Sequence, residues 1–252
     1  MEKVHLPVIM IASAVEMHQT LKKMGNVRRE ACRGTIFFTG SLAGKDIILV
    51  RTGVGAQKAG SAARRILPRF MPLSVLIIGA AGALDPLLGI GDIVVAQNIA
   101  LPGGEMFSCN DRITWQSVSV LSKAGLPVRS GTVLGVDGFV HRKDEKNALW
   151  GATGAEVIDM ESGELARCLL TMRMPFVNIR IVSDTATRDT ADLTTLFAYR
   201  KKYGAAWLLW FFLQRPGELI KTVRLVYDLR SLSVAIADIA ELLVSHDVFS
   251  VR

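Results

Sequence analysis

Short apolar runs alternate with stretches of helical periodicity along most of the chain. The runs are rich in β-branched residues and bounded by glycine, as is typical of buried strands. They cover 4–12, 35–39, 46–51, 75–79, 92–97, 131–136, 155–158 and 176–183, and helices are predicted over 15–24, 56–67, 115–125, 141–149 and 161–172. This alternation predicts a single-domain α/β fold, whose central mixed, largely parallel sheet is flanked by helices.

The C-terminal part of the chain has another pattern. After Arg215-Pro216-Gly217, apolar residues recur with helical spacing at Leu219, Val223, Val226, Leu232, Ile236, Ile239 and Leu243. This spacing predicts an amphipathic helix, so we divide the chain into a main domain over 1–214 and a helical extension over 215–252. The extension either packs on the domain or a partner subunit, or lies on a membrane surface with its basic residues outside the apolar stripe.

Composition indicates a folded, reduced protein. Half of the residues are apolar and 21% are charged, which excludes wholesale disorder. Cys32, Cys109 and Cys168 lie far apart, as expected for free thiols rather than a disulfide framework. No signal peptide begins the chain, and the longest apolar stretch, 205–213, is about half of what a membrane span needs. We therefore expect a cytoplasmic protein.

The basic balance of the chain does not by itself indicate nucleic acid. The net charge is +7, but the lysines and arginines are scattered in small groups, and no recognition helix, zinc spacing or aromatic RNA-binding pattern accompanies them. The four histidines offer no metal-ligand spacing, so we expect neither a nucleic-acid partner nor a metal.

Glycine-bearing strand exits are the first candidate site features. In sheets of this kind, ligands bind beyond the carboxyl ends of the strands, and small residues there let a ligand approach the backbone. These exits are Ser13, Gly53-Val54-Gly55, the Gly79 to Ala83 segment and the Gly135 to Phe139 segment. Any one of them alone is commonly just a turn.

Two carboxylates at strand exits are more informative. Glu161 lies in the first turn of a predicted helix, and Asp184 ends the apolar strand over 176–183. Taken singly, such residues usually pair with the helix dipole or cap a turn. Together, at two exits of one sheet, they form a candidate pair of an acid and a charge stabiliser.

Five motifs carry a resemblance to a known family. They are Gly79-Ala-Ala-Gly-Ala-Leu84, Gly91-Asp-Ile-Val-Val95, Gly135-Val-Asp-Gly-Phe139, Asp159-Met-Glu-Ser162 and Arg180-Ile-Val-Ser-Asp184, in this order. The set resembles the purine nucleoside phosphorylase/uridine phosphorylase superfamily, nearest its methylthioadenosine/S-adenosylhomocysteine nucleosidase branch, over about 4–213. The resemblance implies cleavage of the N-glycosidic bond of a purine (adenine) nucleoside and, because the family pairs subunits, a homo-oligomer.

The resemblance also implies roles for individual residues. Met160 would lie under the ribose and Glu161 on its hydroxyls, while Ser183 and Asp184 would lie at the purine, with Asp184 giving a proton to N7. Phe139 and Val140 match residues that contact the base. Gly53, Gly55, Ala80 and Arg180 would lie beside the nucleophile, and Ser13 is a further substrate-binding candidate. Because the bond breaks to a cationic sugar and an anionic base, we expect an ionised Glu161 and an Asp184 kept protonated by burial.

The sequence departs from the family around the nucleophile. Aligning Ala14 to His18 onto the acidic cluster of the hydrolases places Glu16 at its start and His18 at the catalytic position. There His18 could act as a base or contact phosphate. Ala80 replaces a family serine and Thr187 an aspartate. These changes favour phosphorolysis, with phosphate as co-substrate and no other cofactor, over hydrolysis by a nucleosidase; a non-catalytic nucleoside-binding protein is the third alternative.

The region after residue 204 departs as well. The sequence Trp207-Leu-Leu-Trp-Phe-Phe-Leu213 and the basic tail are similar to the hopanoid-associated phosphorylase branch. This resemblance implies a lipid-linked (adenosylhopane-type) substrate and peripheral membrane contact. The alternative is that 207–213 is an ordinary buried helix.

Overall fold

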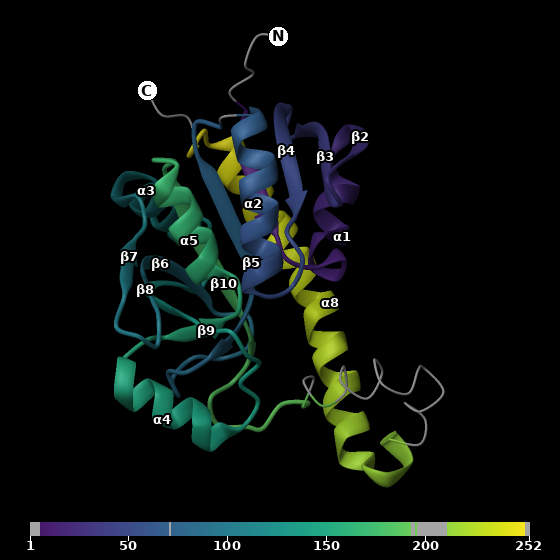
Figure 1. Ribbon diagram of the computed structural model, residues 1–252, viewed down its shortest axis with the longest axis vertical. Helices are drawn as coiled ribbons and strands as arrows, with labels where there is room; N and C mark the ends of the chain where they lie inside the picture. The colour runs from purple at the N-terminus through teal and green to yellow at the C-terminus, as the bar shows by residue number, and fades with distance from the viewer. Residues whose placement is uncertain (1–5, 71, 193–194, 196–210, 250–252) are drawn as a thin grey trace.

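A single mixed sheet organises the chain (Figure 1). The computed structural model describes residues 6–70, 72–192, 195 and 211–249, and ten strands within them form the sheet. The strands are β1 (Val8–Ile11), β2 (Gly25–Cys32), β3 (Thr35–Leu42), β4 (Lys45–Arg51), β5 (Val75–Ala83), β6 (Ile93–Ala100), β7 (Met106–Ser108), β8 (Val128–Gly135), β9 (Val157–Asp159) and β10 (Phe176–Asp184). The helices are α1 (Ala14–Lys23), α2 (Ala56–Phe70), α3 (Asp111–Lys123), α4 (Lys143–Thr153), α5 (Ser162–Thr171) and α8 (Pro216–Ser245). The predicted α/β fold is confirmed.

Both faces of the sheet are covered, because successive side chains of a strand point to opposite sides. In β1, Val8 and Met10 join a core that includes side chains of α2 and α5. Ile9 and Ile11 join a second core that includes side chains of α1, α3 and α8. Continuous apolar runs such as β1 and β4 are therefore buried on both faces, as expected for inner strands.

The sheet closes on itself around β5. This strand pairs in parallel with β1 and β10 and antiparallel with β9. Pairings of β10 with β6, β6 with β8 and β8 with β9 complete a ring of five strands among the described residues. The glycine-rich segment from Gly79 to Ala83, predicted as a loop after the strand, is part of β5. Pairing on two sides outweighs the weak strand preference of glycine here.

Two strands were not predicted from the sequence, because their hydrophobic pattern is weak. β2 is mostly exposed and carries Arg28, Arg29 and Glu30, so nothing in its hydropathy predicted a strand. β7 has three residues and was also not predicted. The predicted strand over 4–12 is β1, and its first two residues lie outside the described part, as do 205–210 of the apolar run.

α8 presents two apolar faces rather than one stripe. Leu232, Ile236, Ile239 and Leu243 are buried in the second core, whereas Leu219, Val223 and Val226 are 42%, 60% and 42% exposed. Six residues separate Val226 from Leu232, and at 3.6 residues per turn they point in different directions. The C-terminal half of α8 is therefore core and the N-terminal half projects from the body (Figure 1). The domain boundary at 214 stays a prediction.

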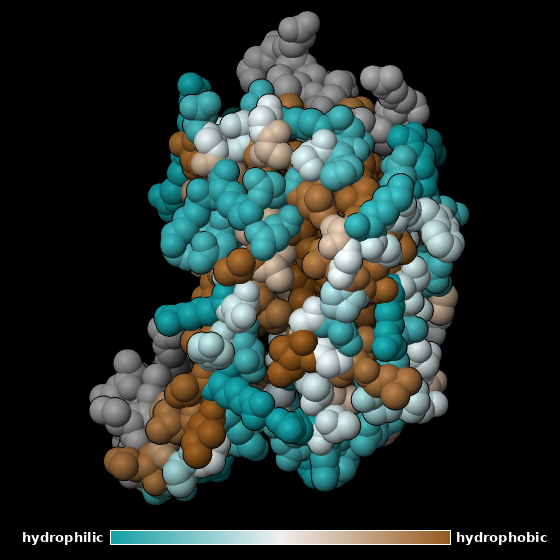
Figure 2. All heavy atoms as spheres, turned by 180° about the vertical axis from the view of Figure 1, so that it is seen from behind, coloured by the Kyte–Doolittle hydropathy of each residue, from teal (hydrophilic) through white to brown (hydrophobic). Residues whose placement is uncertain are grey.

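The projecting half of α8 carries apolar side chains on its exposed face. Figure 2 shows them at the lower left of the view, and the most exposed are Leu213, just before the helix, and Ile220, Val223 and Tyr227. Within the described residues, no helix is both long enough and apolar enough to span a bilayer. The predicted membrane contact and homo-oligomer stay predictions, with this face as the surface they would use.

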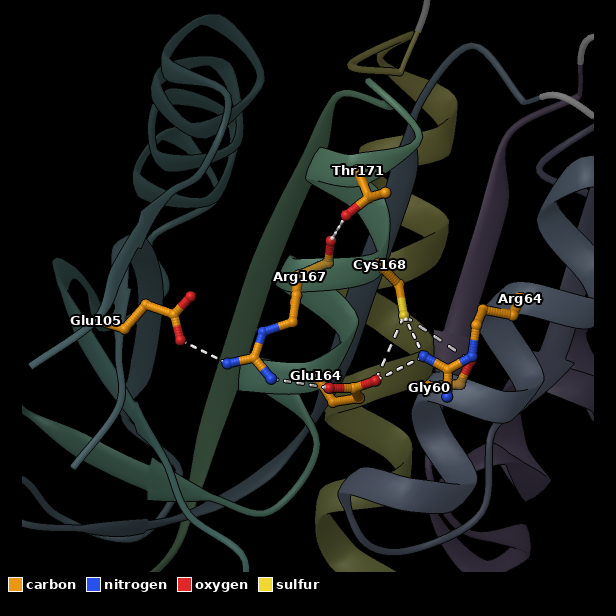
Figure 3. A network of polar contacts seen from close by, with 7 residues as sticks. All are labelled: Gly60, Arg64, Glu105, Glu164, Arg167, Cys168 and Thr171. Carbon is orange, nitrogen blue, oxygen red and sulfur yellow. Dashed lines mark hydrogen bonds and ion pairs between the residues drawn. The ribbon is translucent and has the colours of Figure 1, made fainter. Parts of the chain in front are cut away.

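A chain of polar contacts ties α5 to its neighbours (Figure 3). Glu164 pairs with Arg64 of α2 at 2.6 Å, and Arg167 pairs with Glu105 at 2.5 Å. Gly60 is required where α2 meets α5, since a Cβ there would lie 2.5 Å from Cγ of Glu164. The ion pairs are half exposed and contribute little each, but they fix the helix whose first turn follows Glu161.

Candidate active site

The buried charges of the molecule gather at one place. Among the described residues, the buried acids are Glu16, Asp159, Glu161 and Asp184, and the buried bases are Arg180 and Lys146. Such residues are almost never fully buried unless they are paired. They come from four parts of the chain: α1, the end of β9, β10 and α4.

Glu16 is held in the first turn of α1. Ser13 caps this helix, and the Glu16 carboxylate accepts a hydrogen bond from the Ser13 N–H at 2.9 Å, which completes a capping box. Its other oxygen accepts from the Ala80 N–H of β5 at 2.8 Å. A Cβ on Gly79 would lie 3.0 Å from Glu16 Oε1 and 2.8 Å from Arg180 Nη1. Glu16 and Arg180 therefore meet over Gly79.

Arg180 is the centre of a buried polar cluster. Its Nη2 lies 2.5 Å from Asp159 Oδ2 and donates to Ser162 Oγ at 2.9 Å. Asn178 also donates to Ser162 Oγ, at 2.5 Å, and Asp159 accepts from the Ser162 N–H at 3.1 Å. A buried arginine needs such partners, because an unpaired buried charge costs several kcal/mol. The cluster fixes the turn between β9 and α5, and with it Glu161.

Glu161 bridges α5 and the loop between β4 and α2. Its Oε1 accepts from the Gly55 N–H at 2.8 Å, and Gly55 has φ of 96°, which favours glycine. Burial and, to a lesser extent, the charge of Asp159 raise the pKa of Glu161 from 4.5 to about 7, against the opposing effect of Arg180. Near neutral pH this carboxyl group is therefore partly protonated, rather than fully ionised as predicted.

Asp184 ends β10 after an irregularity in its pairing with β5. Ser183 Oγ lies 2.7 Å from its Oδ1, and the ammonium of Lys146 pairs with its Oδ2. Asp184 is therefore paired with a lysine of α4, a partner that the sequence pattern did not reveal. Its predicted role as the acid at N7 stays a prediction.

Glu16 and Asp184 lie beside different residues of the same strand, β5. Glu16 lies against Gly79, and a Cβ on Gly82 would lie 3.2 Å from Asp184 Oδ2. Three residues of a strand span roughly 10 Å. This separation suits a ligand that places one reacting group at Glu16 and Glu161 and another at Asp184.

His18 is not part of this cluster. It is exposed on α1, and positions two apart on a helix point in nearly opposite directions, so the buried orientation of Glu16 turns His18 outward. The structure brings Glu16 into the buried cluster and leaves His18 outside it, and a catalytic role for His18 stays a prediction. The Ser13-x-x-Glu16 spacing is a capping-box pattern that could have placed Glu16 at the end of β1.

Three other predicted site residues lie close to the surface of the protein. Phe139, Val140 and Met160 are partly buried, and Val140 packs against the small core of Leu84, Leu134, Ala155 and Ile158. Their roles at the base and ribose stay predictions.

Gly53 and Ala80 contribute backbone N–H groups to hydrogen bonds at the candidate site. Gly53 has φ of 84° and donates its N–H to the Ala12 carbonyl at 3.0 Å, while the N–H of Ala80 binds Glu16.

Two cavities adjoin the site. One, of about 150 Å³, lies between Asp184, Thr190 and the exposed part of α8, including Ile220 and Leu225. The other, of about 430 Å³, lies on the outer side of Gly53. Its charged lining residues are Arg51, Lys58 and Arg65, without an acid.

Comparison with known proteins identifies the family of the chain. Residues 8–205 match the family model described as the phosphorylase superfamily. A 5'-methylthioadenosine/S-adenosylhomocysteine nucleosidase of Marinomonas sp. (strain MWYL1) is 25% identical over 66% of this chain and 80% of that protein. The protein of the same name from Bacillus subtilis (strain 168) is 26% identical over 71% of this chain and 87% of its own length.

Solved structures share the fold. The nucleosidase of Neisseria meningitidis, in complex with methylthio-immucillin-A, superposes with a TM-score of 0.78 at 20% identity, covering 96% of this chain and all of that chain. Futalosine hydrolase of Helicobacter pylori strain 26695 has the same TM-score at 18% identity, covering 96% of this chain and 98% of that chain.

Proposed function

Because the chain belongs to the phosphorylase superfamily and is an enzyme of it, we propose that it hydrolyses the N-glycosidic bond of a purine nucleoside, with Glu16 activating the water. The observation that carries the proposal is the buried Glu16 carboxylate, held at 2.8 Å from the Ala80 N–H and facing Arg180 over Gly79. A carboxylate fixed in this way is a general base that can orient and deprotonate a water molecule.

The electrostatics around Glu16 favour water over phosphate. Glu16, Asp159 and Glu161 lie together with a single arginine, and that arginine is already paired with Asp159. A phosphate dianion placed among these carboxylates would be repelled in a site of low dielectric. A neutral water molecule can donate a hydrogen bond to Glu16 without that cost.

The remaining groups fit the charge changes of the reaction. Breaking the C1′–N9 bond puts positive charge on the sugar, which an ionised Glu161 stabilises. It puts negative charge on the purine, which Asp184 relieves when a proton reaches N7. Since the pKa of Glu161 is raised to about 7, we expect the rate to rise with pH through neutrality as Glu161 ionises.

The relatives support an adenine nucleoside. Both bacterial proteins cited above are named for methylthioadenosine and S-adenosylhomocysteine, so nucleosides with a 5′-thioether are the first substrates to test. The lipid-linked substrate stays a prediction; its tail would leave the site by the cavity beside Asp184, which Ile220 of the exposed α8 face lines.

Phosphorolysis is the second candidate function. The basic cavity lined by Arg51, Lys58 and Arg65 adjoins Gly53, whose neighbour Gly55 binds Glu161. An anion held there would lie one loop away from the site. This cavity is the observation that keeps phosphate as a co-substrate in consideration.

Adenine release tests the proposal. Methylthioadenosine and S-adenosylhomocysteine are incubated with the enzyme with and without phosphate, and released adenine and the sugar product are measured. We expect the same rate in both and free sugar as product. Glu16→Gln should lower kcat by roughly 10²–10⁴-fold, whereas Glu145→Gln on the exposed side of α4 should not. Sugar 1-phosphate formed only with phosphate would favour the second candidate.

A further inference from the structure

Lys146 is placed unusually for a lysine. It is fully buried, and it is the one buried residue of α4, whose other residues face outward or lie partly exposed. A lysine is almost never fully buried unless its charge is paired. An apolar side chain could fill this buried position without the cost of burying a charge, so a lysine here suggests a specific role for its ammonium group.

The ammonium of Lys146 is aimed at Asp184. Its Nζ pairs with Asp184 Oδ2 and donates to the Thr185 carbonyl at 3.1 Å. Ser183 Oγ lies 2.7 Å from the other carboxylate oxygen. Lys146 therefore contacts a residue of the proposed reaction.

This pairing creates a difficulty for the proposed reaction. The purine leaves easily only if N7 is protonated, and the Asp184 carboxylate accepts the hydrogen bond of the Lys146 ammonium rather than donating one. The proton must come from a neighbour of Asp184. Lys146 is the only fully buried proton donor that the described residues place against its carboxylate.

We propose that Lys146 is a positioning residue that supplies the proton which Asp184 passes to the leaving purine. The inference rests on the proposed hydrolysis. As the C1′–N9 bond breaks, its electron pair goes to the base, Asp184 gives a proton to N7, and Lys146 gives a proton to Asp184. The oxygen of water bonds to C1′ and its proton goes to Glu16. Solvent then returns a proton to the neutral amine of Lys146 and removes one from Glu16.

A structural role alone explains the pair less well. A buried ion pair is often no more stable than apolar residues of the same volume, so holding α4 in place does not require a lysine. Other charged groups line the cavity beside Asp184, so Lys146 is not the only charge near this carboxylate. These groups are Arg188 and Asp189 after β10, and Lys221, Arg224 and Asp228 of α8.

The test compares variants of the full-length enzyme. Lys146→Met removes the ammonium at nearly constant volume, and Lys146→Gln keeps a donor that cannot supply the proton. Lys143→Met, an exposed lysine of the same helix, is the control. We expect both Lys146 variants to lower kcat by roughly 10²–10⁴-fold, with KM changed by less than about threefold, and the control to match the unmodified enzyme.

Two further readouts separate proton supply from structure. The double variant Lys146→Met with Asp184→Asn should be no slower than Asp184→Asn alone, since residues that act as a unit are not additive. In Lys146→Met the rise of the rate with pH that ionisation of Glu161 predicts should be weakened or reversed, because Asp184 must then hold the proton itself. Thermal unfolding at each pH confirms that the folded protein is compared.

The outcomes separate the two claims. A folded Lys146→Met enzyme with kcat within threefold of the unmodified one, or a full-rate Lys146→Gln enzyme, overturns the role of Lys146 and leaves the hydrolysis standing. Multiplying losses in the double variant also overturn it. An unmodified enzyme that releases no base from any nucleoside overturns the proposed function and this inference together.

Discussion

The substitution Glu161→Gln tests how much the buried charge of Glu161 destabilises the folded protein. Glu161 is 6% exposed, and its neighbours include the carboxylates of Asp159 and Glu16. Glutamine keeps the shape and can still accept the Gly55 hydrogen bond, but it has no charge. The substitution should therefore remove catalysis and, at neutral and higher pH, stabilise the fold.

The size of this stabilisation follows from the pKa of Glu161. The group titrates near 7 in the folded chain and at its ordinary value of 4.5 when unfolded, which at 1.36 kcal/mol per pH unit corresponds to about 3 kcal/mol. Between these two pH values the folded state binds more protons than the unfolded state. The wild-type protein thus loses stability as pH rises from 4.5 to 7, and the loss is complete above 7.

Urea unfolding between pH 4.5 and 8.5 measures the effect. The free energy of unfolding of Glu161→Gln minus that of the wild type should rise by up to about 3 kcal/mol from low to high pH. Glu145→Gln, a change at an exposed glutamate of α4, should give a flat difference. A flat difference for Glu161→Gln as well would refute the assignment of a raised pKa to this carboxyl group.

Three further substitutions or labels test other parts of the structure. Arg180→Met should destabilise the fold by about 3–5 kcal/mol, because Asp159 is left buried and unpaired; Arg129→Met, at a half-exposed pair, should cost about 1 kcal/mol or less in urea unfolding. Burial raises the pKa of the Cys109 thiol to about 12, so iodoacetamide at pH 8 should label Cys109 only when the protein unfolds. If the exposed face of α8 binds membrane, Ile220→Ser should reduce co-sedimentation with anionic vesicles and Leu87→Ser should not; equal binding of both variants would count against this surface.

The strands and helices of the fold could be predicted because the apolar pattern of each segment reflects its own burial. Runs such as those of β1, β4 and β10 are apolar throughout, since both their faces are buried. The closure of the sheet through β5 and β10 is not local. Gly79 to Ala83 has poor strand preference, and it forms a strand because it pairs with β10 and β9, which lie far away in the sequence.

The candidate site could be predicted only in part, because some of its residues are marked by local sequence and others only by tertiary structure. Glu161 and Asp184 stood out because each follows a strand. The choice between Glu16 and His18 depended on which side of α1 faces the sheet, and an alignment of the segment does not show that. Lys146 lies in a charged run, Lys143-Asp-Glu-Lys146, that reads as a solvent-exposed turn of helix. Only the tertiary position of α4 turns it toward Asp184.

The origin of the oxygen on the sugar tests the proposed reaction most directly. The enzyme cleaves a purine nucleoside in water enriched in ¹⁸O, with phosphate present, and the sugar product is analysed by mass spectrometry. If Glu16 activates water, the sugar carries one ¹⁸O at C1′, no sugar 1-phosphate forms, and Glu16→Gln abolishes the labelled product. A sugar 1-phosphate without ¹⁸O at C1′ would contradict hydrolysis.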